Sequence, residues 1–308
     1  MKKIQFSLFT RIFFVTMTLL AFGLLMIYSA SVSEALRDFG NKWYFVDLQL
    51  KRAGIGLVLL VAASFIPPRA WQSLAPLLLI GGLLLLIMVL IPGIGVRVQG
   101  ARRWLALPGI NLQPAELIKF IEITYLASWL SSRRVTLIQF LTFIAITTGL
   151  IMLEPDMGTA IVVALIAVAM YFLAGYPATH LWVIGGAGLV LGSLLIFSST
   201  YRLERLKTFF DPEHDPSGSA YHIRQVVLAL GSGGITGVGI GRSRQKYEYL
   251  PESTTDSIFA VVGEELGFLG SVSLIGLFTY LITLVFRVAS ATQNPYASLL
   301  SAGIGAWI

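Results

Sequence analysis

The sequence has no cysteine and only three histidines, His180, His214 and His222, which are scattered along the chain. Without cysteine the chain forms no disulfide, thiolate nucleophile or zinc–cysteine site, and three separated histidines do not predict a metal-binding cluster. Charged residues are also scarce, at 12% of the 308 residues, whereas a soluble domain has about 25%. Any chemistry must therefore rest on carboxylates, hydroxyls, lysine and arginine.

Hydrophobic residues are abundant instead, at 56% of the chain. They form long apolar runs, which predict an all-α polytopic membrane protein with a single membrane-embedded domain, residues 1–308, that is incomplete at its C-terminus. The predicted spans are 12–30, 53–66, 74–91, 115–130, 137–153, 159–174, 181–198 and 268–286, and a ninth span begins near Ala297 and is cut off at Ile308.

The first apolar run follows Lys2, Lys3 and Arg11 and ends at the small residues 29–31, as in a secretory signal peptide. A signal-peptide core has roughly 7–15 apolar residues, and this run is longer and is followed by further spans. We therefore expect it to remain as the first helix.

The charges leave the orientation of the chain open. With the N-terminus inside, the short loops on the two sides carry equal numbers of Lys and Arg, so the positive-inside rule does not decide. The net charge of +6 favours anionic lipid or phosphate-bearing partners. No nucleic-acid-binding module is recognisable.

A basic segment, Arg102-Arg103-Trp104, lies between the third and fourth predicted spans. Trp and Arg side chains often settle at headgroup level, so the segment could be an interfacial anchor. With the N-terminus inside, however, Arg97, Arg102 and Arg103 run against the charge bias of outer loops. An anionic ligand on that side is the alternative.

Three charged residues, Glu116, Lys119 and Glu122, lie three positions apart in the fourth predicted span. This spacing places them on one side of a helix, which should face protein rather than lipid. Asp156, in the turn before the sixth span, could cap that span or pair with Lys119. We predict that Lys119 meets Glu116 or Asp156.

The one long polar loop runs from 199 to 256, and loops of this length are commonly functional. Residues 221–230 have the spacing of an amphipathic surface helix. The glycine-rich stretch 231–241 lacks a nucleotide-binding pattern, so we interpret its glycines as sites where backbone turns or approaches another surface. Arg242, Arg244 and Lys246 form either a solvated basic turn or a phosphate contact.

Five carboxylates, Glu248, Glu252, Asp256, Glu264 and Glu265, lie within 247–270. One helix over 257–287 would be about 46 Å long, more than the hydrocarbon core of about 30 Å, so we expect a break at glycine 263, 267 or 270. Asp256 would begin this helical region. Its side chain is either a helix N-cap or a general base at the membrane surface.

Several long motifs in this order resemble the SEDS family, the RodA and FtsW group of bacterial peptidoglycan polymerases. The likeness covers essentially the whole chain, and 242–246 is closer to the FtsW branch. The position after Asp256 is usually Phe in this family and is Ser257 here. The motifs that carry the resemblance are Gly100-Ala101-Arg102-Arg103-Trp104-Leu105 with Gln113-Pro114-Ala115-Glu116, Glu154-Pro155-Asp156-Met157-Gly158-Thr159-Ala160, Tyr249-Leu250-Pro251-Glu252 with Thr255-Asp256, and Gly263-Glu264-Glu265-Leu266-Gly267.

The resemblance implies a ten-span fold, with 199–256 as a large extracytoplasmic loop, in the bacterial cytoplasmic membrane. It also implies a glycosyltransferase that polymerises lipid II at the outer face, for cell division or cell shape. Asp256 matches the catalytic aspartate. No cofactor is required, although a divalent cation, Mg or Mn, could take part. The implied partners are a class B penicillin-binding protein and other division or elongation proteins, and the residues expected at the substrate are Arg102, Arg103, Trp104, Arg242, Arg244 and Glu252.

Two other interpretations remain open. A lipid II flippase or other transporter would use Glu116 and Lys119 to line a path through the membrane. An inactive scaffold would tolerate loss of Asp256. Polymerisation by the purified protein separates both from the enzyme.

Overall fold

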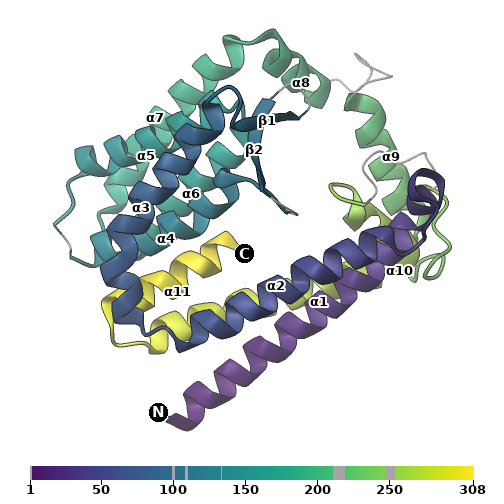
Figure 1. Ribbon diagram of the computed structural model, residues 1–308, viewed down its shortest axis with the longest axis horizontal. Helices are drawn as coiled ribbons and strands as arrows, with labels where there is room; N and C mark the ends of the chain where they lie inside the picture. Colours follow the sequence, from purple (N-terminus) through teal and green to yellow (C-terminus); the bar gives the residue numbers. More distant parts are fainter. Residues whose placement is uncertain (1, 99–100, 108–109, 133, 211–218, 247–253) are drawn as a thin grey trace. The chain divides into compact units, whose positions relative to one another are not determined.

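The computed structural model describes residues 2–98, 101–107, 110–132, 134–210, 219–246 and 254–308 (Figure 1). The chain divides into two compact units, each built from two separate stretches. The first unit comprises Met1–Ala63 and Val190–Leu281, and the second comprises Ser64–Leu189 and Ile282–Ile308. Helices α7 and α10 contribute to both units.

Each predicted apolar run lies in a helix. The helices are α1 (Lys2–Phe39), α2 (Tyr44–Phe65), α3 (Pro68–Leu90), α4 (Pro114–Ser131), α5 (Leu137–Leu153), α6 (Met157–Leu173), α7 (Ala178–Phe197), α8 (Thr200–Phe210), α9 (Ser219–Ser232), α10 (Ile258–Ala291) and α11 (Pro295–Trp307). In the described part of the chain five of them, α1, α2, α3, α7 and α10, are long and apolar enough to cross a membrane, and α5 and α6 are shorter apolar helices. The polytopic helical membrane fold is thereby confirmed.

The second unit is organised around α4, which packs against α3, α6 and α11. Residues on all sides of α4 are buried, as expected of a central helix. Helix α11 approaches α4 closely at Gly303, where an added Cβ atom would lie only 2.7 Å from the side chain of Ile123. A second cluster of buried apolar residues joins α4 to Leu86 of α3 and Val163 of α6.

Capping side chains and a proline at the helix starts of this unit explain where the helices begin. Thr136 and Gln139 form a reciprocal capping box at the start of α5. The side chain of Asn294 accepts hydrogen bonds from the backbone of Tyr296 and Ala297 at the start of α11. Helix α4 has Pro114 in its first turn, where a missing N–H costs nothing.

The first unit contains α1, α2, α8, α9 and most of α10. Met26 and Ala30 of α1 are buried in one apolar cluster with Ala229 of α9 and with 260–262 of α10. The small residues 29–31 therefore lie inside a continuous helix. Helix α9 covers the stretch predicted to be an amphipathic helix, whereas α8 was not predicted.

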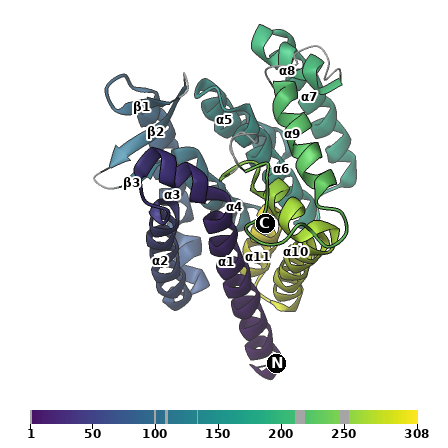
Figure 2. The ribbon, with the colours of Figure 1, turned by 90° about the vertical axis from the view of Figure 1, so that its right-hand side faces the viewer.

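A small antiparallel sheet in the second unit was also not predicted. Its strands are β1 (Gly95–Val98), β2 (Ala101–Leu107) and β3 (Ile110–Leu112), in the order β1-β2-β3. The strands gather near the end of α3, from which the chain enters β1 (Figure 2). Since β3 leads into α4, the sheet connects two apolar helices, and it carries the basic segment 102–104.

Candidate active site

Helix α10 is broken at Gly267, one of the three glycines at which a break was predicted. Gly267 has φ 68° and ψ −164°, outside the helical region. In an uninterrupted helix the N–H groups of Phe268 and Leu269 would donate to the carbonyls of Glu264 and Glu265. The break removes these bonds and leaves four backbone groups of an apolar helix that need other partners.

The glycine-rich stretch before α10 supplies all four partners. Two of its carbonyls accept from the amides after the break, and two of its amides donate to the carbonyls before it. The bonds are Phe268 N to Gly234 O (2.9 Å), Leu269 N to Ile235 O (3.1 Å), Val238 N to Glu264 O (3.0 Å) and Gly239 N to Glu265 O (3.0 Å). The glycine-rich loop therefore satisfies the backbone hydrogen bonds that the helix break leaves open.

Glycine is required where the two backbones meet. A Cβ atom on Gly233 would overlap the carbonyl of Gly263, and one on Gly237 would overlap the carbonyl of Glu265. Gly237 also has φ 82°, a conformation that other residues rarely adopt. The prediction that these glycines allow close backbone approach is confirmed.

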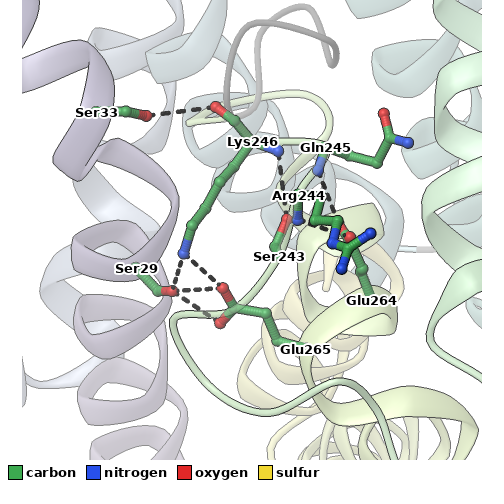
Figure 3. Close-up of polar contacts among 8 residues, drawn as sticks. All are labelled: Ser29, Ser33, Ser243, Arg244, Gln245, Lys246, Glu264 and Glu265. Atoms are coloured by element: carbon green, nitrogen blue, oxygen red, sulfur yellow. Dashed lines mark hydrogen bonds and ion pairs between the residues drawn. The ribbon is translucent and has the colours of Figure 1, made fainter.

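The carboxylate of Glu264 holds the basic turn that follows the glycines (Figure 3). The hydroxyl of Ser243 donates to it at 2.5 Å, the amide of Arg244 at 2.8 Å and the amide of Gln245 at 3.4 Å. Ser243 and Glu264 are buried. The side chains of Arg242 and Arg244 are exposed, so the backbone of this turn is anchored while its guanidinium groups face outward.

The carboxylate of Glu265 forms a buried ion pair with Lys246. Lys246 Nζ lies 2.8 Å from Glu265 Oε1, and the two side chains are 4% and 0% exposed. Ser29 of α1 completes the group, since its hydroxyl lies 2.7 Å from both carboxylate oxygens and 3.2 Å from Lys246 Nζ (Figure 3). We call Ser29, Lys246 and Glu265 the Lys246 clamp.

Asp256 lies in the turn before α10 and is exposed. Among the residues that the structure describes, its carboxylate has no hydrogen-bond or ion-pair partner. Because α10 begins at Ile258, two residues later, the N-cap interpretation of Asp256 is not supported. Glu252 and the motif 249–252 lie outside the described residues.

The neighbouring Ser257 is buried and anchors this turn. Its hydroxyl lies 2.6 Å from Nε2 of His222 in α9. Its carbonyl accepts from the amides of Ala260 and Val261 in the first turn of α10. The residue that departs from the usual Phe thus fixes the backbone immediately after Asp256.

In the second unit, Arg103 and Arg102 have different surroundings. Arg103 Nε donates to the carbonyl of Glu154 at 3.1 Å, and its Nη2 donates to the carbonyl of Pro155. Arg102 is half-exposed and pairs in register with Arg97 of β1. Within the described residues neither Arg97 nor Arg102 has an acidic partner.

Asp156 caps α6. Its Oδ1 accepts from the amide of Thr159 at 3.1 Å, and its Oδ2 accepts from the side chain of Gln113 at 3.3 Å. Among the described residues, Asp156 has an ion-pair contact with Arg103, whose Nε lies 4.0 Å from its Oδ2. The alternative pairing of Asp156 with Lys119 is wrong, because the capping geometry turns the carboxylate towards β2.

Lys119 instead pairs with Glu116, at 2.7 Å, and its Nζ lies 5.5 Å from the ring centre of Trp307. The Lys119 side chain is 12% exposed, as expected of a charge that faces protein. Glu116 is 53% exposed, which corrects the expectation that both partners face the bundle. The reason is its place in the first turn of α4, beside the sheet.

Glu154 is buried between α5 and α6, and in the described part of the chain both of its carboxylate oxygens lack a hydrogen bond. Burial and, second, the nearby charge of Asp156 raise its pKa to about 8, although Arg103 opposes the shift. Glu154 is therefore protonated over much of the neutral range. The sequence motif contained this residue but did not predict its burial.

Sequence reasoning also missed the partners of Glu264 and Glu265. The signal available was two adjacent carboxylates in the apolar stretch that opens α10, which must be paired if they are buried. Their partners come from 243–246, in the preceding loop, and from Ser29, which is 236 residues away from Glu265 in sequence. No group of three or more His, Asp or Glu side chains suited to a metal ion occurs among the described residues, and the divalent cation stays a prediction.

Residues 10–308 match the family model of the FtsW/RodA/SpoVE cell cycle proteins. The probable peptidoglycan glycosyltransferase FtsW of Coxiella burnetii is 41% identical over 95% of this chain and 82% of its own length. The protein of the same name from Trichlorobacter lovleyi is 40% identical, over 93% of this chain and 77% of its own length. Stage V sporulation protein E of Bacillus subtilis is 36% identical, over 94% and 80%.

Solved structures show the same likeness. A chain of a peptidoglycan synthase complex that coordinates polymerisation and crosslinking is 27% identical, with a TM-score of 0.77 over 96% of this chain and 82% of that chain. The rod shape determining protein RodA of Thermus thermophilus is also 27% identical, with a TM-score of 0.68 over 96% and 80%.

Proposed function

Since the chain belongs to the FtsW/RodA/SpoVE family of cell cycle proteins, we propose that it is a peptidoglycan glycosyltransferase acting in cell division or cell-shape maintenance. The substrate in this proposal is lipid II, a disaccharide-peptide on undecaprenyl diphosphate, at the outer face of the cytoplasmic membrane. The observation that carries the proposal is Asp256, an exposed carboxylate without a partner among the described residues, held on an anchored turn at the start of α10.

Asp256 is the proposed general base. A hydroxyl of the acceptor sugar attacks the anomeric carbon of the donor, the bond from that carbon to the lipid diphosphate breaks, and Asp256 takes the hydroxyl proton. An unpaired carboxylate suits this role because no ion pair must be broken before it accepts a proton. With no cysteine in the chain and His222 bonded to Ser257, few other groups near this turn could act as base.

Arg102 is the proposed contact for the substrate's phosphates in the second unit. Like charges directly opposite each other on paired strands are unfavourable, and Arg97 and Arg102 form such a pair. An anion between them would relieve the repulsion through charge-assisted hydrogen bonds. Arg103 is already committed to the carbonyls of 154 and 155, so we assign it the structural role of holding β2.

Trp104, Arg242 and Arg244 complete the proposed substrate contacts. The two arginines are exposed on a turn whose backbone is anchored by Glu264, so they are available to stabilise negative charge on the departing diphosphate. Glu252 is proposed to share the acceptor proton with Asp256. A divalent cation could neutralise the same diphosphate, but the described residues offer no three-ligand group for it.

The proposed membrane partner is a class B penicillin-binding protein. The support is the likeness to a chain of a peptidoglycan synthase complex. Such a partner would crosslink the strands that this chain polymerises.

The test is polymerisation by the purified protein. Reconstituted in lipid vesicles with lipid II as the only substrate, it should extend glycan strands without any nucleotide. Movement of lipid II across the bilayer without polymerisation would instead support the flippase, in which Glu116 and Lys119 line the path. Neither activity, with partner binding retained, would support a scaffold.

A further inference from the structure

The Lys246 clamp has no role in the chemistry proposed above, yet it buries two opposite charges in the first unit. Removing charged groups from water costs several kcal/mol per ion, and a buried ion pair often stabilises a fold no better than apolar residues of similar size. Its better-attested use is to specify one arrangement of the chain. We therefore expect this ion pair to hold one segment of the chain in a fixed position.

Two members of the clamp, Lys246 and Glu265, lie on either side of Asp256 in the sequence. Lys246 precedes Asp256 by ten residues and Glu265 follows it by nine. Ile258, where α10 begins, lies about 10 Å along the helix axis from Glu265, at 1.5 Å per residue. The chain is thus bound to α10 at Lys246 and rejoins the same helix just after Asp256.

One end of this stretch is bound to α10 and the other to α9. At one end Lys246 meets Glu265, and the preceding backbone amides meet Glu264 (Figure 3). At the other end Ser257 bonds to His222. Fixing both ends restricts the positions that Asp256 can adopt relative to α10.

We propose that Lys246 and Glu265, with Ser29 of α1, are positioning residues for Asp256. The inference rests on the proposed function, in which Asp256 is the base. A base must lie within hydrogen-bond reach of the proton that it takes, and a misplacement of about 1 Å can cost about 100-fold in rate. Ser29 also makes the first membrane helix part of this arrangement.

The test compares variants of the complete protein in lipid vesicles. Lys246→Met or Glu265→Gln alone leaves an unbalanced or unsatisfied buried group and should lower the melting temperature. The double variant Lys246→Met/Glu265→Gln removes both charges and should melt close to the unchanged protein. Its kcat should nevertheless fall by between about 10- and 100-fold, with the KM for lipid II within about twofold.

A matched control removes an ion pair of the same chemistry elsewhere in the first unit. Lys207 and Glu204 of α8 lie 3.0 Å apart and are 49% and 54% exposed. The variant Lys207→Met/Glu204→Gln should keep the kcat unchanged. Lys246→Arg, which retains the buried charge, should recover part of the kcat lost in Lys246→Met.

Combination with Asp256→Asn separates positioning from a general structural role. If the clamp acts through Asp256, the double variant should cause no further loss in the Asp256→Asn background. Full kcat in a folded double variant, or the same fold loss in both backgrounds, would overturn the inference. Full activity of Asp256→Asn itself would refute the assignment of the base, which is a different result.

Ser29→Ala provides a second route if the double variant does not fold. This change keeps both charges and removes only the hydroxyl between them. It should lower the kcat when Asp256 is present and leave the residual rate of Asp256→Asn unchanged. An unchanged kcat in Ser29→Ala would count against the inference.

Discussion

Arg103 Nε donates to the backbone carbonyl of Glu154 at 3.1 Å and thereby ties β2 to the turn between α5 and α6. Two adjacent arginines in the sequence are thus given different tasks. Arg103 donates to backbone carbonyls, whereas Arg102 lies opposite Arg97 on the paired strands. Their separate substitution tests this division of roles.

Arg102→Gln should weaken substrate binding without affecting the fold. A hydrogen bond to a charged group contributes about 1.5–3 kcal/mol, so the KM for lipid II should rise about 10-fold or more, and its dependence on salt should become weaker. Arg103→Gln should instead lower the free energy of unfolding by about 1–3 kcal/mol, because the carbonyls of Glu154 and Pro155 lose their charged donor. A raised KM for Arg103→Gln together with a loss of stability for Arg102→Gln would mean that the two roles are reversed.

Asp256→Asn should abolish most of the activity while leaving the protein folded. Loss of a general base lowers rates by about 10²- to 10⁴-fold, and the melting temperature should stay the same because Asp256 is exposed and does not cap α10. For the same reason Asp256→Ala should behave alike. A folded variant with full polymerisation would move the assignment to Glu252.

Glu154 should make the stability of the protein depend on pH. Its pKa is raised from 4.5 to about 8, so the folded state keeps a proton that the unfolded state releases as the pH rises above 4.5. Stability from this group is therefore lost between pH 4.5 and about 8. The melting temperature of Glu154→Gln, compared with the unchanged protein from pH 5 to 9, should fall less steeply. Glu116→Gln is the exposed control, and equal slopes for all three proteins would contradict the prediction.

Gly237→Ala should disrupt the junction between the loop and the helix break. The added Cβ atom would overlap the carbonyl of Glu265, and the backbone has φ 82°, so we expect a loss of about 2–5 kcal/mol in the free energy of unfolding. Gly231→Ala is the control, since Gly231 lies in α9 with open space around it. That change should be neutral or stabilise by up to about 1 kcal/mol. Equal unfolding free energies for both variants would show that the close approach is not required.

The apolar helices were predictable because a membrane permits few solutions for the backbone. A run of about 20 apolar residues in lipid must satisfy its own N–H and C=O groups, which selects a helix. Leu137–Leu153 was predicted with the bounds that the structure has. The break in α10 was predicted for a similar reason, since length and glycine content alone required it near Gly267.

Side-chain partners were not predictable in the same way. Ser29 and Glu265 are 236 residues apart, and no periodic pattern relates them. Likewise, Arg102 and Arg103 are equivalent in sequence, and only the pairing of β1 with β2 and the position of the α5–α6 turn distinguish them.

The sequence by itself thus determined the class of the protein and its apolar helices, and it singled out Asp256 as the carboxylate that we propose as the base. Only the tertiary structure decided which charges are buried together and which remain exposed. The physical reason is that hydropathy and glycine content act locally along the chain, whereas the partner of a buried charge is set by which distant segments pack against it.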